Sequence, residues 1–507
     1  MNSRLISETT NTARSSVVVS VTQLSAALLG GLFALLVAVI VGEGDATDGF
    51  LAAYSAYLLL ILFGTTMRVS LVPMLGSTAD PDSFSQRAGK RVSQILPVAF
   101  AACLVFAALA PLLGRLLLQG ASDAAQAAAV QSIALLGIAA LFQIWAAVLA
   151  SVLGASRRFI GSSLIYLVSS FVMVILAGGL MELYGITGAA IGVVLSALIL
   201  LVGHLVYLAR LGFTAWPRTA ALLNSESWRA TAKVSGGSVL TMVLQLNLMI
   251  SIGFVSGATG IVSGYVYAYL ATIMATGVTA ATIGLVTMPG LIASLARDGH
   301  VAARHYLRET AAFGAFLYVP VAVGFACFGR PIVDAVLGGS LTPGTLNFFW
   351  DAARIFLLMG LIWSIFAPLT TLALSEHRYG TLAAVAFALI PIHIVLVAAL
   401  SPYGATHTAI GHAISGVLLY MTLDAVLLGR DALHATWEVL LSVSPCALLA
   451  MVFVVPSVLL GVTTLAGSII ALAVSTMAYV LLGVRFWPRV GGRMLQLLVG
   501  TTPSEAH

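Results

Sequence analysis

Apolar segments separated by short polar connections fill the chain from residue 15 onward. Most of them exceed the roughly 20 residues that an α-helix needs to cross the hydrocarbon core of a bilayer. Charges and turn residues at their ends indicate where each helix stops. The pattern therefore predicts about fourteen membrane-spanning helices. We expect them at residues 15–41, 49–75, 92–118, 124–153, 160–181, 185–209, 234–256, 260–294, 309–329, 345–374, 380–400, 404–428, 437–461 and 463–486.

An internal repeat relates the first six of these helices to the next six. The segment YGITGAAIGVVLS, which begins at Tyr184, returns as YGATHTAIGHAIS at Tyr403. PLLGRLLLQG at Pro111 and PIVDAVLGG at Pro331 match at nearly the same spacing, as do the loops ASRRFIG and SEHRYGT. Because each repeat has an even number of spans, both halves face the same way, which is typical of transporters.

The predicted fold is therefore an all-α polytopic membrane protein with two pseudo-symmetric six-helix lobes and two further C-terminal helices. A cleft between two such lobes would be exposed alternately to each side of the membrane. The expected parts are a cytoplasmic leader at 1–14, an N-lobe at 15–209, a cytoplasmic linker at 210–233, a C-lobe at 234–428, and accessory helices with a cytoplasmic tail at 429–507.

Composition supports a membrane protein. Hydrophobic residues make up 60% of the 507 positions and charged residues only 8%, whereas a soluble domain is about 25% charged. The 3 cysteines lie in apolar segments at unrelated spacings and form no redox or metal motif. The polar N-terminus precedes an apolar segment too long for a signal-peptide core, so we expect it to remain attached.

Basic residues fall almost entirely on one side of the predicted helices. Of the 23 Lys and Arg residues, only Arg115, Arg330 and Arg354 fall toward the other side. Since basic loops remain in the cytoplasm, both termini are predicted to be cytoplasmic. The net charge of +5 is explained by these loops, which contact anionic membrane lipids. No basic segment interleaved with aromatic residues predicts nucleic-acid binding.

Few ionisable residues lie at the predicted depth of the membrane, and each is a functional candidate. Arg68, near the cytoplasmic end of the second helix, is either a cation for a substrate phosphate or an anchor at the interface. Asp424 and His393 are the titratable groups expected to lie deepest. Either residue is a candidate to couple protons or sodium to conformational change.

Two further polar pairs have both a structural and a functional interpretation. Gln245 and Asn247 either bond between helices or contact a substrate. Asp351 and Arg354 are three residues apart on one helical face, which favours an ion pair at the outer surface over a gate.

Acidic residues cluster in the predicted first outer loop. Glu43, Asp45 and Asp48 occupy this loop, where a solvated charge is the default expectation. Asp48 and Asp351 are nevertheless the two gate candidates, since both are acidic and lie at the predicted outer end.

The sequence contains no recognisable catalytic constellation. The phosphate-binding pattern GxxxxGK[ST] is absent, and no paired carboxylates or His cluster have a catalytic spacing. We therefore expect no enzymatic activity, no metal site and no cofactor. Coupling to H⁺, Na⁺ or the membrane potential is the expected source of energy.

Several segments resemble the MurJ/MviN family. In the first half these are ATDGF at 46–50, LVPML at the end of the second helix, VLGASRRF at the start of the fifth, and ARLGF at 209–213. In the second half, GIVSGYVYAYL at 260–270 and TIGLVTMPGLIASLARDG at 282–299 are similar to the family's eighth helix and the loop after it. The resemblance covers nearly the whole chain in order.

This resemblance implies the fold shared by MurJ, the O-antigen-type flippases and the multidrug MATE exporters, which form one flippase superfamily. It also implies a polyprenyl diphosphate carrying sugars as substrate, for which Arg is a suited partner. Family members place basic residues in the first two helices, whereas this chain has no charge in the first and neutral residues in the second, leaving only one Arg. The substrate-binding candidates are Arg68, Ser55, Gln245, Asn247 and Arg354.

The resulting hypothesis is a MurJ-like flippase that moves lipid II or a related cell-wall or glycan precursor from the cytoplasmic to the outer leaflet by alternating access. The alternative is a MATE-like, ion-coupled exporter of a small or amphipathic molecule. The expected location is the bacterial inner membrane. Expected partners are the lipid-linked substrate, membrane lipids and candidate cell-wall synthesis enzymes, and we expect a monomer.

Overall fold

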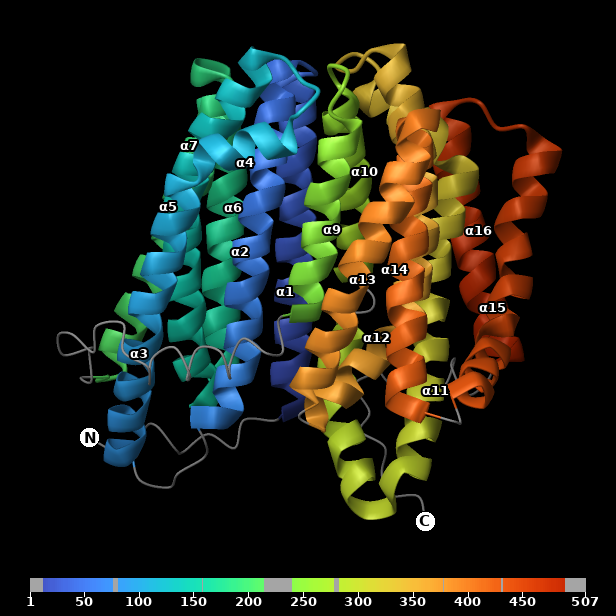
Figure 1. Cartoon of the computed structure of the whole chain (residues 1–507). Coiled ribbons are helices and arrows are strands. Elements are labelled where there is room, and N and C mark those ends of the chain that lie inside the picture. Colours follow the sequence, from blue (N-terminus) through green and yellow to red (C-terminus); the bar gives the residue numbers. More distant parts are fainter. Residues whose placement is uncertain are drawn as a thin grey trace. The chain divides into compact units, whose positions relative to one another are not determined.

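The computed structural model describes residues 12–75, 81–156, 158–213, 239–277, 282–376, 378–429 and 432–487, and its regular structure in these ranges is entirely helical (Figure 1). Among the described residues, 12 helices are long and apolar enough to cross a membrane. Two shorter apolar helices lie between them in sequence, at Val239–Val255 and Ile261–Thr276. The predicted all-α, multi-pass fold is confirmed, and about fourteen spans are compatible with these helices.

The helices have the following bounds. The first part of the chain contains α1 (Thr12–Leu36), the π-helix η2 (Val37–Val41), α2 (Asp45–Leu75), α3 (Pro81–Ala108), α4 (Ala110–Leu117), α5 (Asp123–Ala155), α6 (Phe159–Tyr184) and α7 (Ile186–Arg210). The second part contains α9 (Val239–Val255), α10 (Ile261–Thr276), α11 (Thr282–Leu337), α12 (Pro343–Ser375), α13 (Tyr379–Leu400), the short 3-10 helix η5 (Ser401–Tyr403), α14 (Ala405–Leu428), α15 (Ala432–Leu460) and α16 (Leu465–Phe486).

The helix boundaries differ from the prediction around α10 and α11. The expected span at 260–294 is divided between two helices, because α10 forms its first part and the start of α11 its last part. Helix α11 is a single helix of 56 residues that also contains the expected span at 309–329. The intervening segment ARDGHVAARHYLRE is polar but rich in the helix formers Ala and Arg. Low hydropathy marks the end of a membrane segment, whereas a helix continues wherever its backbone is not interrupted.

The contacts divide the chain into two compact units. Unit 1 comprises residues 1–266 and 382–408, and unit 2 comprises 267–381 and 409–507. These bounds differ from those of the two sequence lobes, because α9, the start of α10 and most of α13 belong to unit 1. The lobe boundaries inferred from the repeat remain a prediction.

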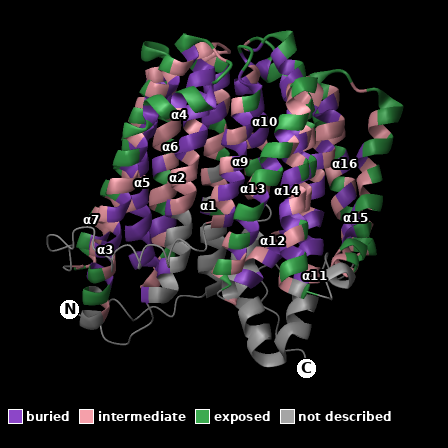
Figure 2. Cartoon of the chain, viewed as in Figure 1, coloured by how far each residue is buried: buried purple, intermediate pink, exposed green. Residues whose placement is uncertain are grey.

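Unit 1 is organised around α5, which contacts α2, α3, α4 and α7. Figure 2 shows buried residues along α5, and every residue from Ala146 to Gly154 is buried. The packing of α2 against α5 depends on Gly49, because a Cβ there would lie 2.4 Å from the carbonyl oxygen of Ala125. Small residues let two membrane helices approach this closely.

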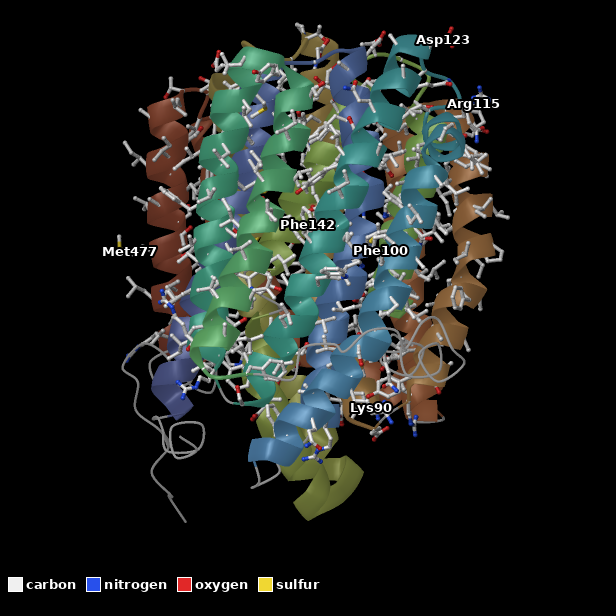
Figure 3. The ribbon with its side chains drawn as sticks, turned by 90° about the vertical axis from the view of Figure 1, so that its left-hand side faces the viewer. Lys90, Phe100, Arg115, Asp123, Phe142 and Met477 are labelled. Carbon is white, nitrogen blue, oxygen red and sulfur yellow. The ribbon has the colours of Figure 1, made fainter. Side chains whose placement is uncertain are left out.

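Charged side chains lie at both ends of the helices of unit 1. Figure 3 shows Arg115 and Asp123 near one end of the helices and Lys90 near the opposite end. The positive-inside pattern predicted Lys90 and Arg115 on different sides, and this arrangement agrees with it.

Unit 2 is organised around α11, which contacts α12, α15 and α16. Tyr318 and Ala322 of α11 form a buried cluster with Ala275 of α10 and Leu357 of α12. By contrast, only 11% of the α15 span and 17% of the α16 span are buried. Their exposed side chains are mostly apolar, so in a bilayer these two helices would contact lipid over most of their surface.

Local hydrogen bonds repeat between the two halves of the sequence. Ser122 caps the start of α5 by accepting the N–H of Ala125, at 3.1 Å. Thr342 similarly accepts the N–H of Thr345 at the start of α12, at 3.4 Å. The paired YG motifs also agree, since Gly185 and Gly404 both have positive φ, at 58° and 112°, a conformation that favours glycine.

Candidate functional site

Asp48 of α2 caps the N-terminus of α10. Its carboxylate accepts the backbone N–H of Gly260 at 2.7 Å and that of Ser263 at 2.8 Å. The Ser263 hydroxyl donates to the same carboxylate. Asp48 is only 2% exposed. The expectation of a solvated loop charge is therefore wrong for Asp48, because helix α2 begins at Asp45 and turns this carboxylate toward the positive end of the α10 dipole.

Asp45, one helical turn before Asp48, joins two other turns of unit 1. Its two carboxylate oxygens accept the hydroxyls of Ser122, at 2.6 Å, and Thr259, at 3.0 Å. Nearby, the N–H of Gly120 donates to the Ser256 hydroxyl at 3.1 Å. The start of α2, the turn before α5 and the turn between α9 and α10 are thus connected at one end of the unit.

Ser55 and Gln245, two of the substrate candidates, are brought together in unit 1. The Gln245 side chain on α9 donates to the backbone carbonyl of Ser55 on α2, at 2.9 Å. The Ser55 hydroxyl donates to the carbonyl of Leu51, at 2.9 Å. Both residues are buried, with exposed fractions of 0% and 2%. The Gln245 side chain therefore joins α9 to α2, whereas the Ser55 side chain bonds within α2.

His393 of α13 bonds to α9 within unit 1. Its Nε2 lies 2.8 Å from the carbonyl oxygen of Asn247 and 3.2 Å from the hydroxyl of Ser251. Because a carbonyl only accepts, Nε2 carries a hydrogen. The Oδ1 atom of Asn247 is buried and has no hydrogen-bond partner among the residues that the structure describes. Two of the predicted candidates, His393 and Asn247, are therefore in contact.

Asp424 of α14 lies in unit 2, where it is 4% exposed. The hydroxyl of Thr436, near the start of α15, donates to its carboxylate. Asp424 also lines a small pocket together with Arg308 of α11 and Glu438 of α15. Arg308 and Glu438 form an ion pair with an N–O distance of 3.9 Å.

The remaining candidates are not assembled into a site. Asp351 and Arg354 of α12 are both exposed. No ion pair joins these two described residues, and Arg354 instead lies over the ring of Trp350, at 6.0 Å from its centroid. Because an exposed ion pair contributes little to stability in water, the Arg354 guanidinium is available to contact the aromatic ring. The side chain of Arg68 lies outside the described part of the chain.

A sequence model of the family described as lipid II flippase MurJ matches residues 37–491. This range covers most of the 507 residues. The chain belongs to the MurJ lipid II flippase family. A comparison with curated proteins finds no match.

Solved structures show that the MurJ fold extends over nearly the whole chain. A structure of lipid II flippase MurJ in an inward closed conformation matches with a TM-score of 0.73 and 16% identity, covering 93% of this chain and 99% of that one. An inward-facing MATE-family multidrug transporter of the MOP superfamily matches with a TM-score of 0.63 and 14% identity, covering 83% and 98%. The Vibrio cholerae MATE transporter VcmN matches at 0.58 and 16%, covering 85% and 97%. At these identities the similarity concerns the fold.

Sequence reasoning missed several polar partners in this MurJ family member. Ser263 and Thr259, which bind the acidic residues of α2, were not singled out, and neither was Thr436 beside Asp424. One local signal was available, since Asp45 and Asp48 are three residues apart and acidic residues are favoured in the first turn of a helix. The partners of these residues could not be identified, because they are more than 200 positions away in the sequence.

Proposed function

We propose that this MurJ family member flips lipid II or a related polyprenyl-diphosphate-linked precursor from the cytoplasmic to the outer leaflet of the bacterial inner membrane by alternating access. The observation that carries the proposal is the family match over residues 37–491. A diphosphate and its sugars are too polar to cross the hydrocarbon core unaided. The family match favours this substrate class over the small or amphipathic molecules of a multidrug exporter.

Arg68 is the residue that we propose to contact the diphosphate. A guanidinium can bind a phosphate through two parallel hydrogen bonds. The other candidates on α2 and α9 are less suited to the role, because the Ser55 hydroxyl and the Gln245 amide already make buried contacts within the protein.

Asp48 is the residue that we propose as a gate at the predicted outer end. Three donors from the start of α10 converge on its carboxylate. Separating α2 from α10 would leave a buried carboxylate without partners unless water entered. The contact therefore favours a closed outer end until a competing interaction or water replaces these bonds.

We further propose that ion binding at Asp424 or His393 couples transport to an ion gradient or to the membrane potential. Both residues are buried and titratable, and each contacts a neighbouring helix. Both termini are proposed to be cytoplasmic, which follows from the distribution of basic residues.

Complementation tests the proposed function. The chain would be expressed in a bacterium whose essential lipid II flippase can be switched off, next to an Arg68→Ala variant. Arg87→Ala provides the matched control, since Arg87 is an exposed basic residue on the same predicted side. We expect survival with the parent and with Arg87→Ala, and loss of survival with Arg68→Ala. Failure of the parent to rescue, with the protein present in the membrane, would argue against lipid II.

A further inference from the structure

A small pocket with a mainly apolar lining and three charged residues lies within unit 2, among α11, α12, α14 and α15. Its charged lining comes from Asp424, Arg308 and Glu438, and α12 contributes only apolar residues such as Phe366 and Leu369. Its volume of about 30 Å³ suits a water molecule and excludes a lipid head group.

The charges in this pocket do not cancel. Arg308 is paired with Glu438. Asp424, by contrast, accepts the Thr436 hydroxyl and has no ion pair among the described residues. An ionised carboxylate is costly on a residue that is only 4% exposed and has no counter-ion among the described residues. The site therefore favours uptake of one positive charge.

The chemistry of the lining favours a proton over a metal ion. Ca²⁺ requires about 6 to 8 oxygen ligands, and Mg²⁺ an octahedral set. The described lining offers the Asp424 carboxylate, the nearby Thr436 hydroxyl, and a Glu438 carboxylate already engaged by Arg308. No cluster of three or more metal-ligating residues occurs in the part of the chain that the structure describes. A proton requires a single lone pair.

We propose that Asp424 is a proton-binding site of the transport cycle and that its protonation state controls how the start of α15 docks on α14. This inference rests on the proposed transport function. A hydronium ion in the pocket transfers its proton to the carboxylate and leaves a neutral carboxylic acid and a water molecule. Among the described residues that line the pocket with Asp424, the charged ones are Arg308 from α11 and Glu438 from α15, and those from α12 are uncharged.

Helix α15 packs along α11, and three polar contacts at its start join it to its neighbours, one to α14 and two to α11. Thr436 donates to Asp424, Glu438 pairs with Arg308, and the Ser442 hydroxyl donates to the carbonyl of Arg308 at 3.4 Å. A hydrogen bond to an ionised carboxylate is roughly twice as strong as one to a neutral acceptor. Protonation of Asp424 therefore weakens the contact with Thr436 and releases the first turns of α15 from α14.

Infrared difference spectroscopy of the purified full chain in lipid nanodiscs tests the protonation step. Between high and low pH, we expect a carbonyl-stretch band from a buried carboxylic acid. The band is lost in Asp424→Asn and retained in Asp334→Asn, a control at an exposed carboxylate that is paired with Arg330. A missing band in the parent, a band retained in Asp424→Asn, or a band that follows Na⁺ at constant pH would overturn the proposal.

Distance measurements between spin labels test the second step. Labels at the exposed positions Met421 on α14 and Leu441 on α15 would be attached after the native cysteines are replaced. We expect the distance distribution to shift with pH in the parent, and Thr436→Val to show the low-pH distribution already at high pH. A distance distribution that does not change with pH in the parent would overturn the proposed docking change. Neither measurement needs the lipid-linked substrate, so failure here is distinct from failure of complementation.

Discussion

The carboxylate of Asp48 receives both the backbone N–H and the hydroxyl of Ser263, although the two residues are 215 positions apart in the sequence. Asp48 lies in the first turn of α2, and Ser263 lies in the first turn of α10. A buried anion thus holds the positive end of one helix against the first turn of another. This contact is a specific target for mutation.

Asp48→Asn is expected to loosen this end of unit 1. An amide keeps the shape of the carboxylate but loses its charge and directs an NH₂ group at one of the converging donors. The loss in the free energy of unfolding should be about 1–3 kcal/mol, as for other buried groups left without a partner. A single cysteine in place of the fully buried Val262 should then react faster with a membrane-impermeant thiol reagent. Asp45→Asn, at a half-buried residue, is the control and should change labelling less.

Gln245→Leu is expected to lower stability while preserving complementation. The substitution removes the bond to the Ser55 carbonyl, and polar bonds between membrane helices contribute about 0.6–1.7 kcal/mol. Thermal unfolding in detergent measures the change. Gln126→Leu is a matched control, because Gln126 also donates to a backbone carbonyl, that of Leu118. Lost complementation with unchanged stability would instead indicate a substrate contact.

His393→Asn is expected to alter the pH profile of transport, whereas His204→Asn should lower only stability. Both histidines are fully buried and contact a serine hydroxyl, Ser251 for His393 and Ser162 for His204. They differ in that His393 connects α13 to α9 beside the unpartnered Oδ1 of Asn247. Flipping in proteoliposomes across a pH series compares the variants. Identical profiles for the parent and both variants would exclude His393 from ion coupling.

Gly49→Ala is expected to destabilise the contact between α2 and α5. The added methyl group would overlap the carbonyl of Ala125, and overpacking of this kind costs about 1–3 kcal/mol. Gly179→Ala on α6 is the control, since a Cβ there would have no described atom within 4 Å apart from its chain neighbours and the backbone of its own helix. Its effect should be neutral or stabilising, because alanine has the higher helix propensity. A comparison of the two Tm values checks the prediction.

The sequence predicted the membrane helices well because length and hydropathy are local properties of the chain. It predicted the relation between the YG motifs because the conformations at Gly185 and Gly404 require the same residue type. It did not predict the continuity of α11, since a polar segment leaves the membrane without ending the helix. Nor did it predict the burial of Asp48, because that depends on Gly260 and Ser263, whose position is set only by tertiary packing.

The π-helix η2 has a consequence for alignment. A π turn bonds residues five apart instead of four, so it contains one residue more than an α-helical turn. The residues of η2 are therefore underwound relative to a continuous α-helix, and the chain leaves the helix directly afterwards at Gly42, whose φ is 77°. The family match begins at residue 37, the first residue of this turn. A regular helical wheel drawn across the whole first span therefore misplaces only its last residues, those of η2.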